Sequence, residues 1–248
     1  MHRFLILIFG IFAYALGMNG LIYFILFVGG WDFLPFHVDS KTPGPFVSAL
    51  GVNLGLITLF GLQHSVMARR SFKQVWTMVI PKAAERSSYC LASGIVLFLL
   101  CFYWKPIPGT LWHVENQIAQ ILLISVQLSG WTFAVVATFV INHFELFGLQ
   151  QVYFNFVNRP EPASEFTEHF LYKIVRHPIQ LGLLIGLWST ANMSMTHMML
   201  SISITVYTLI GLYYEEKDLV ASWGKDYQDY RQRVPKIIPL LMRRLSKP

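Results

Sequence analysis

Hydrophobic residues in this chain gather in long blocks, not at the alternating spacing of a soluble core. Residues 4–28 form an apolar run without a charged side chain, and further apolar blocks cover 46–62, 88–103 and 117–141. A helix needs about 20 apolar residues to cross a bilayer. Each block therefore predicts a membrane-spanning helix. The first run continues past Ala13-Tyr14-Ala15, so we expect an uncleaved anchor and not a signal peptide.

The last apolar block, residues 179–214, is too long for one span. Polar and small residues at 192–196 interrupt it, which predicts a tight helical hairpin that a simple count would score as one element. The pattern as a whole predicts an all-α integral membrane protein with five to six spanning segments. The last two form the hairpin, and a cytoplasmic amphipathic tail follows it.

Composition agrees with a membrane protein, since 54% of the 248 residues are hydrophobic and 13% are charged. A soluble domain carries roughly 25% charged residues. The two cysteines, Cys90 and Cys101, lie in one apolar block and are too few for a disulfide framework or a zinc site, so no metal is expected. We interpret the basic excess as a record of topology and contact with membrane lipid, not as a nucleic-acid surface.

The basic residues are distributed unevenly between the segments that separate the blocks. If the chain alternates across the membrane, 17 of the 19 Lys and Arg residues lie on one side. The other side has the segments 29–45 and 104–116, which carry only Lys41 and Lys105. Since cytoplasmic loops are enriched in Lys and Arg, both termini and the loop 68–87 are predicted to be cytoplasmic.

With this topology, five polar clusters fall at the cytoplasmic membrane surface, at 63–65, 85–87, 142–145, 176–178 and 215–216. Ionisable groups at membrane depth are costly unless they are paired, line a cavity or have a function, so we expect a pocket there. In Arg176-His177-Pro178, proline suits the first position of a helix. The amides of a helix start and the fork of an arginine both attract a carboxylate. The alternative is an ordinary interfacial arginine.

Glu215 and Glu216 lie where the hairpin returns to the same surface, and Tyr227 and Tyr230 follow. A carboxylate beside a pocket can bind ribose hydroxyls or an amino group, and tyrosine rings can stack on adenine. The alternative for the tyrosines is an amphipathic helix on the lipid surface.

These C-terminal residues carry a resemblance over roughly 171–239. Leu171-Tyr172-Lys173-Ile174-Val175-Arg176-His177-Pro178-x-x-x-Gly182, a hairpin, Glu215-Glu216-x-x-Leu219, Gly224-x-x-Tyr227-x-x-Tyr230 and Val234-Pro235 resemble the signature of the isoprenylcysteine carboxyl methyltransferase superfamily. Gln180 departs from it, because the superfamily often has an aromatic residue there. The resemblance implies a membrane-embedded enzyme that binds S-adenosylmethionine, with a cofactor site made of Tyr172, Arg176, His177, Pro178, Leu181, Gly182, Glu215, Glu216, Tyr227 and Tyr230.

The N-terminal half narrows the resemblance. Phe60-Gly61-Leu62-Gln63-His64-Ser65-Val66-Met67-Ala68-Arg69, Glu85-Arg86-Ser87-x-Tyr89 and His143-Phe144-Glu145-Leu146-Phe147-Gly148-Leu149 resemble the bacterial methanethiol S-methyltransferases. This implies methylation of methanethiol to dimethyl sulfide in a bacterial inner membrane. We expect one membrane-embedded domain over 1–248, with substrate-side helices in 1–145 and the cofactor-binding hairpin and tail in 171–239.

The chemistry requires a thiolate nucleophile. A cysteine thiol has a pKa of about 8.5, and a simple alkyl thiol should be a weaker acid still. His64 and His143 are candidate bases, Glu85 or Glu145 could orient one of them, and Arg86 could stabilise the thiolate. Spacing alone does not rank these roles. The residues predicted to line the thiol side, opposite the amino-acid end of the cofactor, are His64, Arg86, His143 and Glu145.

Two other functions stay open on the sequence. One is methylation of a lipid or a prenyl-cysteine carboxylate at the same cofactor site, which a wide lateral opening between helices would favour. The other is a non-catalytic transport or assembly protein of the same fold. A small thiol is the expected substrate, and the sequence is silent on oligomeric state.

Overall fold

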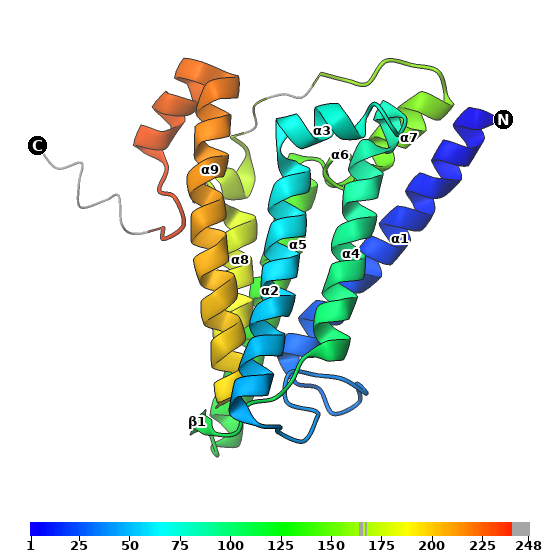
Figure 1. Ribbon diagram of the computed structural model, residues 1–248. Helices are drawn as coiled ribbons and strands as arrows, with labels where there is room; N and C mark the ends of the chain where they lie inside the picture. Colours follow the sequence, from blue (N-terminus) through cyan, green and yellow to red (C-terminus); the bar gives the residue numbers. More distant parts are fainter. Residues whose placement is uncertain (164–165, 167, 240–248) are drawn as a thin grey trace, which may run out of the picture. The chain divides into compact units, whose positions relative to one another are not determined.

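The computed structural model describes residues 1–163, 166 and 168–239 of the chain. Within this part, five helices are long and apolar enough to cross a membrane (Figure 1). They are α1 (His2–Gly29), α2 (Phe46–Ala68), η1 (Lys82–Ala84) continued by α4 (Glu85–Tyr103), α5 (Gln117–Ile141) and α9 (Met195–Arg233). The prediction of an all-α, multi-pass membrane protein is confirmed.

The predicted blocks and the observed helices differ mainly at their ends. The block 117–141 coincides with α5, whereas α2 continues through Gln63 and His64 to Ala68. Hydropathy detects the apolar core of a span, and nothing in Gln63-His64-Ser65-Val66 breaks a helix, so the backbone stays helical beyond that core. The first polar cluster therefore lies inside the last turns of α2 and not after them. Two short helices, α3 (Arg70–Trp76) and α7 (Leu149–Phe156), were not predicted.

The predicted hairpin is present, but its first arm is only partly helical. Proline 178 opens α8 (Pro178–Trp188), as its place in the sequence predicted. With 11 residues α8 is about 16 Å long, roughly half of a hydrocarbon core. The chain from 172 to 191 nevertheless runs along α5. The Tyr172 hydroxyl donates to the Ala137 carbonyl at 3.4 Å, and the Val114 amide donates to the Ala191 carbonyl at 2.9 Å.

The chain divides into two compact units. The first comprises Met1–His113, His143–Ala163 and Asn192–Leu200, and the second comprises Val114–Asn142, Ser164–Ala191 and Ser201–Pro248. The chain passes from one unit to the other several times, so each unit is built from segments that are separate in the sequence. Each unit is held together by close helix contacts of its own.

In the first unit, α1 packs closely against α4. A side chain at Gly20 would collide with the backbone of Gly94, and small residues of this kind allow helices to approach in a membrane. At one end of this unit β1 (Thr110–His113) and β2 (Asn192–Ser194) pair antiparallel. At the same end the Lys41 ammonium donates to the Phe102 carbonyl, so the loop after α1 meets the segment that ends α4. The two segments that carry few basic residues thus share one end of the unit.

In the second unit, α5 packs against α8. A side chain at Gly182 would meet the backbone of Gly130, and the Gln127 amide donates to the Gly186 carbonyl at 3.2 Å. The Trp188 indole donates to the Thr205 hydroxyl at 3.0 Å, which ties α8 to α9.

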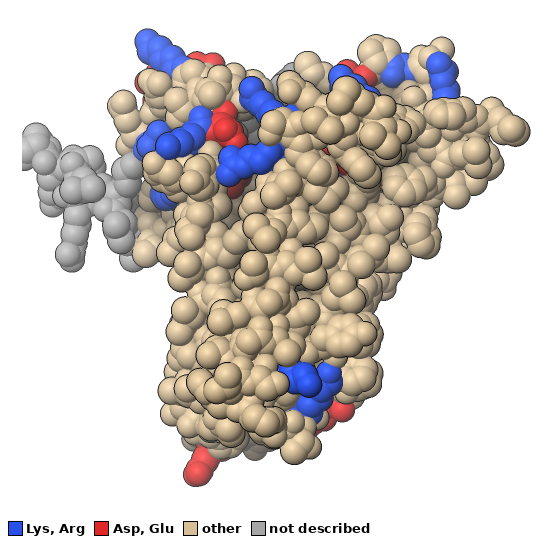
Figure 2. All heavy atoms as spheres, in the orientation of Figure 1, with Lys and Arg blue, Asp and Glu red and all other residues tan. Residues whose placement is uncertain are grey.

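Figure 2 shows the charged side chains near the ends of the helices, with uncharged residues along their lengths, as expected of spanning helices.

Candidate active site

A buried ion pair forms the centre of the polar cluster in the second unit. The Arg176 guanidinium donates from Nε and Nη2 to Oε1 of Glu216, at 2.9 and 2.6 Å. His177 Nε2 lies 3.2 Å from the same oxygen, and the Tyr227 hydroxyl donates to it at 3.4 Å. The side chains of Arg176 and Glu216 are 7% and 9% exposed. The Arg176 fork, which the sequence suggested as a binding group for a ligand carboxylate, is thus paired with a carboxylate of the chain itself.

The same arginine holds the segment after α9. Its Nη1 donates to the carbonyls of Arg231 and Val234 at 2.8 and 2.9 Å, and its backbone amide donates to the Pro235 carbonyl at 2.9 Å. The backbone breaks at Gly224, whose φ of 56° lies in the left-handed region. This break turns the last part of α9 back onto Arg176. We call residues 225–236 the C-terminal segment.

The two tyrosines of this segment point inward. Tyr227 and Tyr230 are each 2% exposed, and the Tyr230 hydroxyl donates to the Tyr172 carbonyl at 2.6 Å. Both rings pack on Phe166. The alternative of a helix on the lipid surface does not describe these side chains, which instead close the segment onto η2 (Phe170–Lys173).

Glu215 differs from its neighbour because its carboxylate is accessible. Its side chain is 47% exposed, Gln180 Nε2 donates to Oε2 at 3.4 Å, and His177 Nδ1 lies 3.9 Å away. Of the two adjacent glutamates, Glu215 is thus the one with capacity for further hydrogen bonds. A carboxylate in this state can bind hydroxyl or ammonium groups.

The remaining predicted cofactor residues lie around this cluster. Tyr172 is buried, and burial raises the pKa of its hydroxyl, which stays a neutral donor. Pro178 is buried at the first position of α8, and Leu181 is half-buried one turn later. Gly182 faces α5, where its missing side chain serves helix packing.

In the first unit, α6 (His143–Leu146) holds His143 inside the protein. His143 is 6% exposed, and its Nε2 lies 2.8 Å from the Tyr14 hydroxyl of α1. Phe147 packs against the imidazole with ring centroids 4.7 Å apart. Burial lowers the pKa of His143, so the imidazole is neutral and can accept a proton near neutral pH.

His64 lies in a second polar group between α2 and α4. The Tyr89 hydroxyl is 2.8 Å from His64 Nε2, and the Ser93 hydroxyl is 3.5 Å from its Nδ1. Gln63 donates to Ser93 at 3.2 Å, while its own buried Oε1 has no partner among the described residues. Buried polar groups inside a spanning helix are unusual and mark functional candidates.

Arg86 lies on the α4 face that carries Tyr89, because residues three apart on a helix are neighbours. Within the described part of the chain its half-buried guanidinium makes no hydrogen bond or ion pair, so it can meet an anion. Glu85 pairs with Lys73 at 3.6 Å and not with a histidine. Glu145 is half-buried on α6, two residues after His143.

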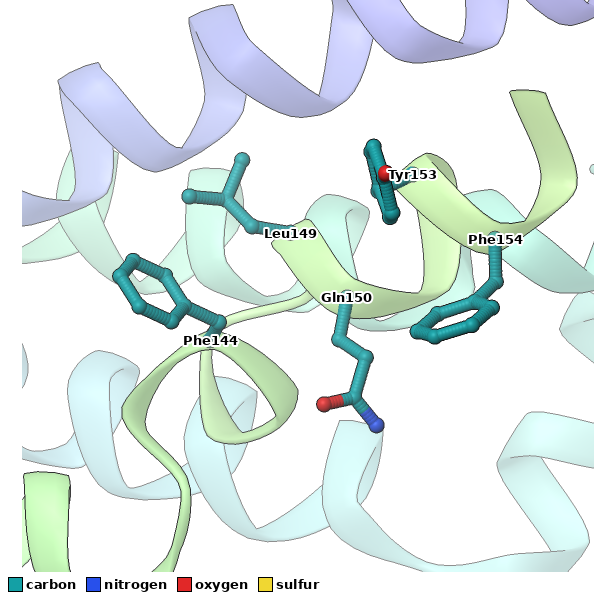
Figure 3. Close-up of a pocket in the computed structure, with 5 residues that line it drawn as sticks. All are labelled: Phe144, Leu149, Gln150, Tyr153 and Phe154. Atoms are coloured by element: carbon teal, nitrogen blue, oxygen red, sulfur yellow. The ribbon is translucent and has the colours of Figure 1, made fainter. Parts of the chain in front are cut away.

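An open cavity of about 320 Å³ lies against α6 and α7 in the first unit. It is lined by Phe144 of α6 and by Leu149, Gln150, Tyr153 and Phe154 of α7 (Figure 3). Its lining is mainly aromatic and aliphatic, with the Gln150 amide and the Tyr153 hydroxyl as its polar groups. Gly148, between α6 and α7, has a φ of 90°, and a side chain there would collide with the backbone of Ser87.

The sequence did not predict Tyr14 and Tyr89 as site residues, although their hydroxyls contact His143 and His64. Tyr89 belongs to the quoted motif Glu85-Arg86-Ser87-x-Tyr89, but spacing did not show that its hydroxyl meets His64. Tyr14 lies in an apolar anchor, 129 residues from His143. A polar hydroxyl inside a spanning helix was the available signal, although Asn19 and Tyr23 of the same helix give a similar one.

The fold and its buried polar groups define an all-α, multi-pass membrane protein with titratable side chains at the ends of its spans. Residues 53–242 match the family described as NnrU protein. Methanethiol S-methyltransferase of Crocosphaera subtropica is 41% identical over 97% of this chain and 94% of its own length. The enzyme of that name from Mycobacterium tuberculosis is 40% identical over 96% and 98%.

The chain belongs to the methanethiol S-methyltransferase family. A more distant relative, Nurim of Danio rerio, is 27% identical over 75% of this chain and 70% of its own length. No solved structure matches the chain.

Proposed function

We propose that this protein transfers the methyl group of S-adenosylmethionine to the sulfur of methanethiol, which yields dimethyl sulfide. The observation that carries the proposal is similarity over nearly the full chain to relatives named for methanethiol methylation. The thiolate attacks the methyl carbon, a new S–C bond forms, and the old sulfonium C–S bond breaks with its electron pair on the departing sulfur. The thiol proton must go to a base.

The second unit has groups suited to S-adenosylmethionine. The cofactor offers ribose hydroxyls and an ammonium group, for which the half-exposed Glu215 carboxylate is a matching acceptor. It also carries a carboxylate, for which Arg231 and Lys236 are matching cations. They are 44% and 36% exposed, and they lie 3.8 and 3.9 Å from Oε2 of Glu216, which a cofactor carboxylate would have to share them with. When bound, the cofactor supplies an electrophilic methyl group. In this proposal Arg176 and Glu216 position the C-terminal segment, and Glu215 contacts S-adenosylmethionine.

The first unit has groups suited to the thiol. We assign proton acceptance to His143, which burial keeps neutral, with His64 as the second candidate. Arg86 would stabilise the thiolate, since its guanidinium is half-buried and has no carboxylate partner among the described residues. All four residues predicted to line the thiol side belong to the first unit. All ten residues predicted for the cofactor site belong to the second. This grouping supports the proposed division of labour between 1–145 and 171–239.

We also propose the orientation in which both termini and the loop 68–87 face the cytoplasm. It rests on the distribution of 17 basic residues against 2. Within the first unit, the contact between Lys41 and the Phe102 carbonyl supports a shared side for 29–45 and 104–116.

The direct test uses purified protein in lipid nanodiscs with both reactants. Headspace gas chromatography should detect dimethyl sulfide only when protein, methanethiol and S-adenosylmethionine are all present. Methyl ester formation on a prenyl-cysteine analogue without dimethyl sulfide would identify the larger substrate instead. No methyl transfer to either acceptor, despite cofactor binding by calorimetry, would favour a non-catalytic role.

A further inference from the structure

The first helix, predicted only as an anchor, contributes a polar side chain to the thiol-side group. The Tyr14 hydroxyl lies 2.8 Å from His143 Nε2, and the two rings meet edge-on with centroids 5.8 Å apart. Phe147 closes over both rings, at 6.3 Å from Tyr14 and 4.7 Å from His143. Tyr14 is thus part of the immediate surroundings of the candidate base.

Close packing holds Tyr14 at one position relative to α4 and α7. Gly10 of α1 packs on Val152 of α7, and Gly17 of α1 packs on Cys90 of α4. A side chain at either glycine would collide with those neighbours. The two contacts lie on either side of Tyr14 in the sequence, so α1 cannot slide along its axis without breaking one of them. The hydroxyl is therefore held at one position relative to α6.

The comparisons separate α1 from the rest of the chain. The NnrU model matches residues 53–242, which excludes α1. The alignment with the Crocosphaera subtropica enzyme covers 97% of this chain, which leaves fewer than ten of its 248 residues outside, so Tyr14 lies within it. The helix that carries Tyr14 is therefore shared with methanethiol S-methyltransferases but lies outside the broader family match.

We propose that Tyr14 is a positioning residue for His143, and that α1 is part of the thiol-handling machinery. The inference rests on the proposed function, in which the thiol S–H bond breaks and the proton forms an N–H bond on His143. A hydrogen bond to one ring nitrogen sets the tautomer and the orientation of an imidazole. A ring misplaced by about 1 Å can cost roughly 100-fold in rate.

The test compares two tyrosines of the same helix. Tyr14→Phe removes the hydroxyl beside His143. Tyr23→Phe is the matched control, because its hydroxyl donates to the Phe36 carbonyl at 3.0 Å. Each variant loses one hydrogen bond from α1. We expect Y14F to lower kcat at least about tenfold and Y23F to stay within about twofold of wild type. Neither variant should change the affinity for S-adenosylmethionine measured by calorimetry.

A double-mutant cycle distinguishes positioning from a general structural role. In a His143→Ala background, measured at a pH where free thiolate is abundant, Y14F should cause no further loss of kcat. Equal losses in Y14F and Y23F, or an undiminished effect of Y14F without His143, would overturn the inference. An active wild type with fully active Y14F would contradict the inference alone. An inactive wild type would contradict the proposed function, and the inference with it.

Discussion

Glu215 and Glu216 are adjacent in the sequence, and the structure predicts opposite consequences for their replacement. Glu216→Ala removes the carboxylate that compensates the buried guanidinium of Arg176, together with the acceptor for His177 and Tyr227. Glu215→Ala removes a carboxylate that is 47% exposed and makes one weak hydrogen bond at 3.4 Å. Each of the two variants therefore serves as the matched control for the other.

The magnitudes follow from burial. Breaking a buried ion pair from one side leaves an uncompensated charge and costs about 3–5 kcal/mol. An exposed carboxylate with distant partners contributes about 0–1 kcal/mol. For a chain of this size 1 kcal/mol corresponds to roughly 2–4 °C in Tm. Glu216→Ala should therefore lower Tm by roughly 6–20 °C, and Glu215→Ala by at most about 4 °C.

Two measurements check this prediction. Thermal unfolding in nanodiscs gives the stability change, and limited trypsin digestion reports release of the C-terminal segment, which has basic cleavage sites at Arg231 and Lys236. Digestion there should accelerate in Glu216→Ala and not in Glu215→Ala. In return, Glu215→Ala should weaken S-adenosylmethionine binding by calorimetry while the fold stays intact. Equal stability of the two variants would refute the reasoning about the buried ion pair.

Three further outcomes are expected. Gly148→Ala should lower Tm, because residue 148 has a positive φ and the new side chain would collide with the α4 backbone. Gly55→Ala is the control: with open space around it, this change should be neutral or stabilising by up to about 1 kcal/mol. His143→Ala should still bind cofactor but lose turnover, and high pH should partly restore turnover because thiolate becomes abundant. A loss of turnover that high pH does not rescue would indicate an orienting role. In intact cells an impermeant maleimide should label Lys41→Cys and not Lys73→Cys, and the reverse pattern would overturn the topology.

Stability should also depend on pH through His143. Burial lowers its pKa in the folded protein below the unfolded value of about 6.5. The unfolded chain then binds more protons than the folded one as the pH falls below that value, so stability is full above it and is lost as pH falls through the folded pKa. Tm measured from pH 8 to 5 should fall less steeply for His143→Ala than for wild type. Parallel curves would contradict a buried, neutral histidine.

Much of the fold could be predicted because a bilayer demands long apolar helices. The block 117–141 coincides with α5, and Pro178 marks the start of α8. Hydropathy failed where the backbone obeys other constraints. It ended the second span at 62, although the polar side chains that follow keep the helix to Ala68. It also placed the interruption of the last block at 192–196, whereas α8 already ends at Trp188, where Ser189 and Thr190 follow.

The candidate site was predictable in its residue types and not in its pairings. Spacing placed Arg176 near the two glutamates, since both flank one hairpin. Only the three-dimensional contacts show that the Glu216 carboxylate is buried in an ion pair with Arg176, while the Glu215 carboxylate is accessible. The partner of His143 could not be found by local patterns at all, because Tyr14 is 129 residues away and reaches it through helix packing.

The central claim is that this protein moves a methyl group from S-adenosylmethionine to methanethiol. The most direct test supplies S-adenosylmethionine with a deuterium-labelled methyl group to the purified wild type and to Glu215→Ala. Headspace gas chromatography with mass spectrometry should show dimethyl sulfide with one labelled and one unlabelled methyl group for the wild type, and much less product for the variant at limiting cofactor. Dimethyl sulfide without label, or no dimethyl sulfide from a wild type that binds the cofactor, would contradict the account.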